Sequence, residues 1–186
     1  LLAVAGRLDE TAFGPADAVE ARPDGTFAAV GTVKGWRRSI YVRQRRTEIP
    51  TLLEDFDLPA MNPNCIERPM STVAPQALHL MNNAMVHDLA VAMADRVIAA
   101  AGSDSDASSR IDLAYRTALG RPPTPEESTL AATTLTRFTE KWTAHLAAQS
   151  GPESADEKTI AQQAANRALA NLCHAIMNSA EFVNID

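Results

Sequence analysis

The sequence predicts a mainly α fold of about five helices, in which an irregular, partly β N-terminal portion precedes a C-terminal antiparallel helical hairpin. Composition supports this prediction, because alanine is very frequent and only 5% of the residues are aromatic, whereas strands prefer branched and aromatic side chains. The second half of the chain also repeats apolar residues at helical spacing. Two capping boxes, at Thr124–Glu127 and Ser154–Glu157, mark two helix starts within it.

The first 70 residues are expected to be loop-rich with short strands. Gly14–Gly25 is rich in Pro, Gly and Asp, which predicts a loop. Thr26–Val33 and Arg38–Val42 are short, partly β-branched runs on either side of Lys34-Gly35, and this pattern predicts a weak hairpin. A short helical turn is predicted at Thr51–Phe56.

A long helix is predicted to follow an extended loop at Met61–Pro69. Ser71 or Thr72 can cap it, and Pro75 falls in its first turn, where the missing N–H costs nothing. Gly102 is a natural stop for this helix. Its apolar stripe consists of Val86, Leu89, Ala90, Met93, Val97 and Ala100.

Three further helices are predicted in the last third of the chain. A shorter helix around Ala114 is expected to end at Gly120. The two long helices that begin at the capping boxes are joined by the polar Gly-Pro link Gln149–Ala155, so we expect them to pair antiparallel. The residues of this pair that we expect to be mostly buried are Phe138, Trp142, Leu169 and Leu172.

We expect a single domain over residues 1–186, loop-rich over 1–70 and helical over 71–186, because this length supports a substantial core. The chain does not begin with Met, which favours a C-terminal fragment of a longer protein. No apolar run approaches the roughly 18 residues that a membrane helix needs. We therefore expect no membrane span.

Positive charge is concentrated in one short segment of an otherwise acidic chain. The net charge is −6, yet residues 34–46 contain six Lys and Arg residues and no acid. Because phosphate affinity depends mostly on summed positive charge, nucleic acid is not an expected partner. Strand-like alternation would place Arg38, Ile40 and Val42 on one face of this segment.

The sequence offers no metal site and no assembled catalytic centre. His79 and His87 are two helical turns apart, too distant to chelate one ion, and no CxxC, HExxH or haem-binding CxxCH motif occurs. We therefore expect no metal and no cofactor in this chain. The residue types of a nucleophilic site are present in Ser71, Cys65, His79 and Asp88, but without a GxSxG elbow. We favour the interpretation that this chain alone is not catalytic.

Two cysteines, Cys65 and Cys173, lie far apart in the sequence. Spacing alone establishes no disulfide between them. Separate reduced thiols are the favoured interpretation, because free cysteine often behaves as a small buried apolar residue.

Six blocks of the sequence occur in an order that resembles a known family. The blocks are LLAVAGRLD (1–9), RRSIYVRQRR (37–46), FDLP (56–59), CIERPMSTVAPQALHLMNN (65–83), AYRTALGRPPTPEE (114–127) and MNSAEFVNID (177–186). The set resembles a domain-of-unknown-function family at the C-terminus of large, multidomain planctomycete proteins that often carry a cytochrome-c-like module.

This resemblance implies a non-catalytic structural or binding module of a larger secreted or periplasmic protein, with the upstream domains as its partners. Two alternatives remain open. The chain could be part of an enzyme that acts on extracellular polysaccharide and is completed by upstream domains, or it could be a scaffold for redox partners.

A binding pocket is predicted where the basic segment meets the first long helix. Guanidinium groups and the free N–H groups of a helix start both attract carboxylate or sulfate groups, such as those of an anionic polysaccharide. The competing interpretation is that Asp55, Asp57 and Glu67 pair with the arginines internally and fix an irregular loop. The candidate binding residues are Arg37, Arg38, Arg68, Ser71, Thr72 and Gln76.

Overall fold

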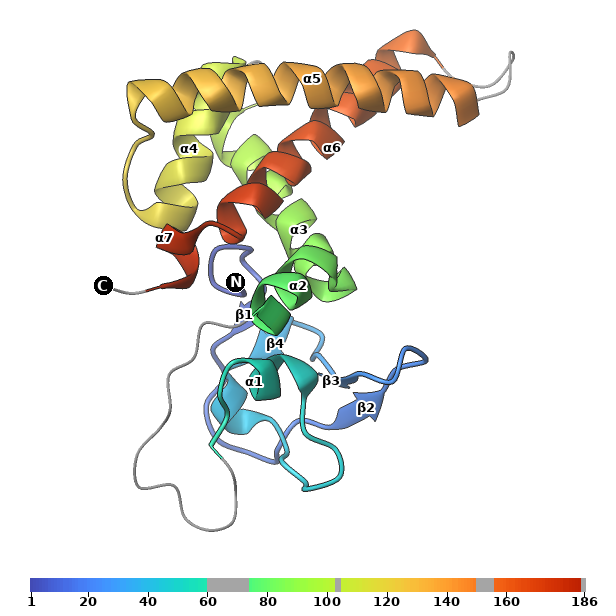
Figure 1. The fold of residues 1–186 in the computed structure, drawn as a ribbon, viewed down its shortest axis with the longest axis vertical. Helices are drawn as coiled ribbons and strands as arrows, with labels where there is room; N and C mark the ends of the chain where they lie inside the picture. Colours follow the sequence, from blue (N-terminus) through green and yellow to red (C-terminus); the bar gives the residue numbers. More distant parts are fainter. Residues whose placement is uncertain (60–73, 103–104, 150–155, 185–186) are drawn as a thin grey trace. The chain divides into compact units, whose positions relative to one another are not determined.

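The computed structural model describes residues 1–59, 74–102, 105–149 and 156–184 (Figure 1). The chain divides into two compact units. The N-terminal unit consists of Leu2 and Arg7–Asn83, and the helical unit consists of Leu1, Ala3–Gly6 and Ala84–Asp186. The prediction of a mainly α fold with a partly β N-terminal portion is confirmed. The N-terminal unit ends at Asn83, so the first helix after the predicted loop belongs to it.

The N-terminal unit contains two small sheets among its described residues. In one sheet, β1 (Leu8–Asp9) pairs in parallel with β4 (Trp36–Arg37). In the other, β2 (Val19–Ala21) pairs antiparallel with β3 (Phe27–Ala29). The predicted loop Gly14–Gly25 is therefore wrong in part, because β2 lies within it. With only two or three residues in each strand, backbone pairing alone holds little of this unit together.

The predicted hairpin has its turn in place, but its strand pairing is wrong. Thr32 and Gly35 exchange backbone hydrogen bonds across the turn, yet the flanking strands β3 and β4 pair with β2 and β1. Gly35 has a φ of +132°, and a Cβ there would lie 2.1 Å from the carbonyl oxygen of Arg7. The N–H of Trp36 donates to that same carbonyl at 2.9 Å. Because of this close approach, β4 pairs with β1 instead of with β3.

The predicted strand Arg38–Val42 is also wrong, because Ser39–Tyr41 forms a 3-10 helix. The expected alternation fails with it, since Ile40 is 82% exposed while Val42 is buried. The backbone of Asp17 forms a bridge to Val42. The segment thus bonds to the loop before β2 at Asp17, and no further strand pairing of the segment occurs with the described residues.

Two helices complete the N-terminal unit, α1 (Thr51–Asp55) and α2 (Ala74–Asn82). The helical turn predicted at Thr51–Phe56 is confirmed by α1. The caps predicted for the next helix, Ser71 and Thr72, lie outside the described residues.

The long helix predicted to end at Gly102 is two helices. α2 ends at Asn82 and α3 (Ala84–Ala101) begins two residues later. Asparagine side chains compete with helical backbone hydrogen bonds, which fits a break at Asn82-Asn83. Gly102 ends α3 with a φ of +89°, as expected. The predicted apolar stripe is buried except for Ala100, which is exposed. The preceding loop, predicted at Met61–Pro69, falls outside the described residues.

The helical unit continues with α4 (Ala107–Leu119), α5 (Pro125–Gln149), α6 (Glu157–Met177) and α7 (Ala180–Val183). α5 and α6 are the two longest and pack mainly on each other, and α3 packs on α6 (Figure 1). Gly120 ends α4 at a φ of +71°, as predicted. The largest fully buried side chains of the unit are Met93, Ile111, Leu169, Met177, Val86, Val97 and Cys173.

One of the two predicted capping boxes is confirmed. Thr124 Oγ1 accepts from the N–H of Glu127 at 3.2 Å, and Glu127 Oε2 accepts from the N–H of Thr124 at 2.7 Å. The second box is wrong, because Asp156 caps α6 and Glu157 is the first helical residue instead of the third. Ser154 lies outside the described residues. Asp and Ser are nearly equal as N-caps, so two candidates this close in sequence compete.

The burial predicted for the helical hairpin is confirmed for Leu169 and Leu172, which are buried. Phe138 and Trp142 are only half-buried. The guanidinium of Arg167 lies 4.8 Å from the centroid of the Trp142 ring and covers part of it. The centre of the hairpin therefore consists of aliphatic side chains, with the aromatic rings toward its edge.

Arg121 joins the ends of three helices in this unit. Its guanidinium donates to both carboxylate oxygens of Glu127, at 2.8 Å each, and to both oxygens of Glu181, at 2.6 and 2.5 Å. Glu127 lies in the first turn of α5 and Glu181 in α7, and Arg121 follows the end of α4. Hydrogen bonds from Arg121 and Thr124 lower the pKa of Glu127 to about 2.

We predict that Leu169→Ala destabilises the helical unit by about 2–5 kcal/mol, because it leaves a cavity at a site that is 1% exposed. Trp142→Ala is expected to cost less, since the half-buried ring leaves a depression that water can fill. Denaturant unfolding of both variants measures the difference. Equal losses would show that Trp142 belongs to the core.

We predict that Arg121→Gln lowers the melting temperature at neutral pH and weakens its dependence on acid. Arg121 lowers the pKa values of both Glu127 and Glu181 in the folded protein. These carboxylates therefore stabilise the fold fully above their ordinary pKa of 4.5, and this contribution is lost as the pH falls from there toward the folded value of about 2 for Glu127. Over that interval the wild-type protein should lose more stability than the variant.

Arg116→Gln is the matched control, because Arg116 forms an exposed ion pair with Asp112 within one helix. Such a pair contributes little to stability. Parallel melting curves for the two variants across the acid range would contradict the role given to Arg121.

Candidate functional site

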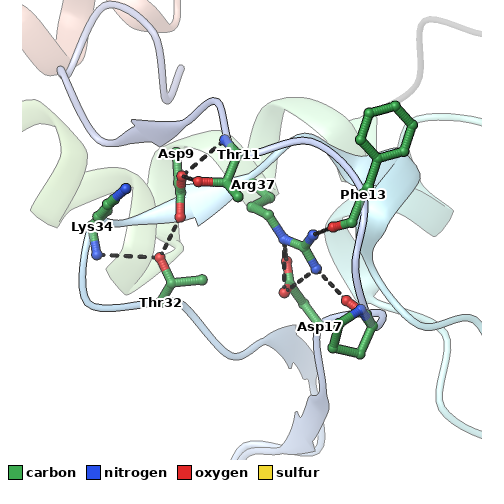
Figure 2. Close-up of polar contacts among 8 residues, drawn as sticks. Asp9, Thr11, Phe13, Asp17, Thr32, Lys34 and Arg37 are labelled. Atoms are coloured by element: carbon green, nitrogen blue, oxygen red, sulfur yellow. Dashed lines mark hydrogen bonds and ion pairs between the residues drawn. The ribbon is translucent and has the colours of Figure 1, made fainter.

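Arg37 lies at the centre of a polar network in the N-terminal unit (Figure 2). Its Nε donates to the two carboxylate oxygens of Asp17 at 3.0 and 3.1 Å, and its Nη2 donates to one of them at 2.7 Å. Nη1 donates to the carbonyl of Phe13 at 2.8 Å, and Nη2 donates to that of Pro15 at 2.5 Å. The guanidinium also lies 4.7 Å from the centroid of the Tyr41 ring.

The segment of residues 13–17 wraps around Arg37, because three of its residues supply acceptors to one planar group. A guanidinium presents five N–H donors in a fixed fork, which suits two carbonyls and a carboxylate together. The side chains of Arg37 and Asp17 are 7% and 12% exposed. Neither charge can be removed without leaving the other buried and unpaired. The conformation of this loop therefore depends on the pair.

Asp9 forms a second, separate network at the end of β1. One carboxylate oxygen accepts from the N–H and the hydroxyl of Thr11, at 3.0 and 2.6 Å, and the other accepts from the hydroxyl of Thr32 at 2.8 Å. The N–H of Lys34 donates to the hydroxyl oxygen of Thr32 at 3.2 Å. These hydrogen bonds, with that of the Thr11 hydroxyl the largest, lower the pKa of Asp9 to about 2. Asp9 is thus a carboxylate at physiological pH although it is 7% exposed.

A pocket of about 540 Å³ lies beside both networks and is formed by the N-terminal unit alone. Phe13 borders it and is 84% exposed. Figure 2 shows the Phe13 ring pointing away from the guanidinium of Arg37. The polar residues that line the pocket are Asp9, Thr11, Asp17, Thr32 and Arg37.

The backbone at the edge of this pocket is unusual. Phe13 has a φ of +66° and Gly14 a φ of +84°. Two consecutive positive φ values are typical of type I′ turns, which favour Asn-Gly or Gly-Gly. A Phe in the first of these positions is disfavoured by its Cβ. The hydrogen bond from Arg37 to the Phe13 carbonyl helps to hold this conformation.

His79 is held between two partners that the sequence did not indicate. Its Nδ1 lies 2.7 Å from Oδ2 of Asp55, and its Nε2 lies 2.9 Å from the side-chain nitrogen of Asn83. The His79 side chain is 8% exposed. Asp55 belongs to α1 and His79 to α2, so this contact ties the two helices together. The arrangement resembles the base and orienting group of a catalytic site, but both ring nitrogens are occupied.

Of the predicted binding residues, the structure describes Arg37, Arg38 and Gln76. Arg37 is buried and paired with Asp17. Arg38 is exposed and Gln76 is buried, 7% exposed. Arg68, Ser71, Thr72 and Glu67 lie outside the described residues. The anion pocket stays a prediction. Arg37 can contribute little to anion binding there, because most N–H donors of its guanidinium already have acceptors.

Within residues 1–59, 74–102, 105–149 and 156–184, no group of three or more His, Cys, Asp or Glu side chains could hold a metal ion. Cys173 is free and lies in the core of the helical unit, where burial raises the pKa of its thiol to about 12. Cys65 lies outside the described residues. No helix in the described part of the chain is long and apolar enough to cross a membrane.

Comparison with known proteins gives a family match. Residues 1–135 match a family described as PSD1, protein of unknown function (DUF1553). No curated protein and no solved structure matches the chain. The match covers the whole N-terminal unit, so the pocket and both polar networks lie within the matched region.

We predict that Arg37→Lys loosens segment 13–17, because an ammonium cannot satisfy Asp17 and two carbonyls with the geometry of the guanidinium fork. The expected results are a lower melting temperature and faster cleavage by chymotrypsin after the exposed Phe13. Arg38→Lys is the control, and it should shift the melting temperature by no more than about 2 °C, since its side chain is exposed.

Asp17→Asn combined with Arg37→Gln removes both charges of the pair. Asp17→Asn alone leaves the buried guanidinium without its carboxylate, and Arg37→Gln alone leaves the buried carboxylate without its guanidinium, so the double variant should lose less stability than the sum of the two. Strictly additive losses would contradict the dependence of the loop on this pair.

Proposed function

The chain belongs to the PSD1 family of proteins of unknown function, and we propose that it is a non-catalytic binding module of a larger secreted or periplasmic protein. Its partners on this proposal are the upstream domains of the same polypeptide. The binding site is the pocket beside Phe13 in the N-terminal unit.

The observation that carries this proposal is the exposed Phe13 ring beside a pocket whose polar groups are fixed in place. A binding site needs positioned groups that do not have to reorganise when the ligand arrives. Arg37 and Asp17 hold each other and the loop, while Asp9 accepts from Thr11 and Thr32. The pocket volume of about 540 Å³ falls in the range of sites that hold small ligands.

The same hydrogen bonds argue against catalysis by these groups. A general acid or base must reach the substrate with a proton to give or a lone pair to accept one, at a pKa near the working pH. Asp9 has a pKa of about 2 and three donors already in place. His79 has Asp55 on one ring nitrogen and Asn83 on the other. These arrangements favour structural positioning.

A ligand panel followed by NMR tests this proposal. We would titrate the ¹⁵N-labelled chain of residues 1–186 separately with neutral oligosaccharides, uronate oligosaccharides, quaternary amines, inorganic phosphate and short peptides. The expected result is saturable shifts of backbone amides in residues 9–17 and 30–37 for at least one class, with the compound unchanged after prolonged incubation.

Three outcomes would overturn the proposal. Saturable shifts confined to other regions, or no binding by any class, would show that the pocket is not a binding site for such ligands. Conversion of a compound into product would show catalysis, provided that a second, independently purified preparation gives the same rate.

A further inference from the structure

Phe13 and its neighbours indicate the chemical class of ligand that this pocket takes. We propose that it binds a neutral sugar residue of a glycan, with the apolar face of the sugar against the Phe13 ring and its hydroxyls donating to carboxylate and threonine oxygens along the pocket. This inference rests on the proposed binding function of the same pocket.

The first step of the argument is that Phe13 does not serve the fold. Its ring is 84% exposed, so it contributes little packing, and its φ of +66° is disfavoured for any residue with a Cβ. Gly or Asn would fit the turn better. Residues that break a local rule without a gain in packing occur mostly at functional sites. An exposed aromatic ring suits a ligand with an apolar face, and the C–H-bearing face of a sugar ring is one.

The second step is that the pocket is not suited to an anion. Nε and both Nη atoms of Arg37 already donate to Asp17, Phe13 or Pro15. Two carboxylates and one guanidinium border the pocket, so its formal charge is negative. A carboxylate or sulfate group would have to displace an existing buried bond or approach Asp9 and Asp17 against this charge.

The third step is that the pocket does not require a cation either. Asp17 is neutralised by Arg37 at 2.7 Å, and Asp9 is stabilised by three hydrogen bonds from Thr11 and Thr32. Each carboxylate has about four lone-pair sites, so acceptor capacity remains on both. The hydroxyl hydrogens of Thr11 and Thr32 are used. The Thr11 oxygen can accept, and the Thr32 oxygen, which accepts from the N–H of Lys34, keeps one lone pair. A pocket bordered by acceptors matches a ligand rich in neutral donors, as a sugar is.

The test is calorimetric titration of the full chain with neutral cello-, xylo-, manno- and malto-oligosaccharides, beside a galacturonate oligosaccharide and choline. We expect at least one neutral oligosaccharide to bind and both charged probes to fail. Phe13→Ala should weaken that binding by roughly tenfold or more, as expected of a central aromatic contact. Phe13→Trp should retain it, because the larger ring keeps the apolar face.

Two further variants separate recognition from folding. Ile40→Ala removes another exposed apolar side chain of the same unit, 82% exposed, and should leave binding unchanged. Phe13→Gly should lose binding while keeping or raising the melting temperature, because glycine adopts this φ without strain. A merely structural role of Phe13 would instead make Phe13→Gly less stable.

The outcomes distinguish this inference from the function on which it rests. If only galacturonate or choline binds, with shifts in the pocket, the pocket is a binding site and the neutral sugar is refuted. If a neutral oligosaccharide binds but Phe13→Ala binds equally well, the inference is also overturned. If nothing in either panel binds, both proposals fail.

Discussion

The guanidinium of Arg37, a residue of strand β4, donates to three residues of the segment 13–17 and lies 4.7 Å from the centroid of the Tyr41 ring. Few other interactions stabilise the described part of the N-terminal unit, since its strands are two or three residues long and few of its apolar side chains are buried. A polar centre fixes geometry more narrowly than an aliphatic one, because hydrogen bonds are directional. The position of Phe13 follows from this centre, as does the pocket beside it.

The helical unit is stabilised by different interactions. Its core is aliphatic, and its helix ends are set by local signals such as Gly102, Gly120 and the box at Thr124. Arg121 then connects α4, α5 and α7 from the outside, with its two carboxylate partners partly open to solvent. Loss of that contact leaves the core intact, whereas loss of Arg37 would leave the N-terminal unit without its centre.

This contrast explains how much of the structure could be predicted from the sequence. Helix ends were predictable where one cap stood alone, as at Thr124, and not where Ser154 and Asp156 compete. Strand pairing was not predictable, because the close contact of Gly35 with Arg7 joins segments that no periodicity connects. The partner of Arg37 was missed because only acids that follow it in the sequence were considered, whereas Asp17 precedes it by 20 residues in a loop that no periodicity connects to β4. Turn preferences give no reason to expect Phe13 at a positive φ.

The position of Cys173 has a practical consequence. Its thiol is wholly enclosed in the helical core, and its pKa is raised to about 12, so the native state offers no thiolate to an alkylating reagent. Modification must wait for α6 to separate from its neighbours. The rate at which this one sulfur is labelled, read by peptide mass spectrometry, therefore reports how often the helical unit opens. Cys173 is therefore a native labelling site for that motion, and no engineered cysteine is needed.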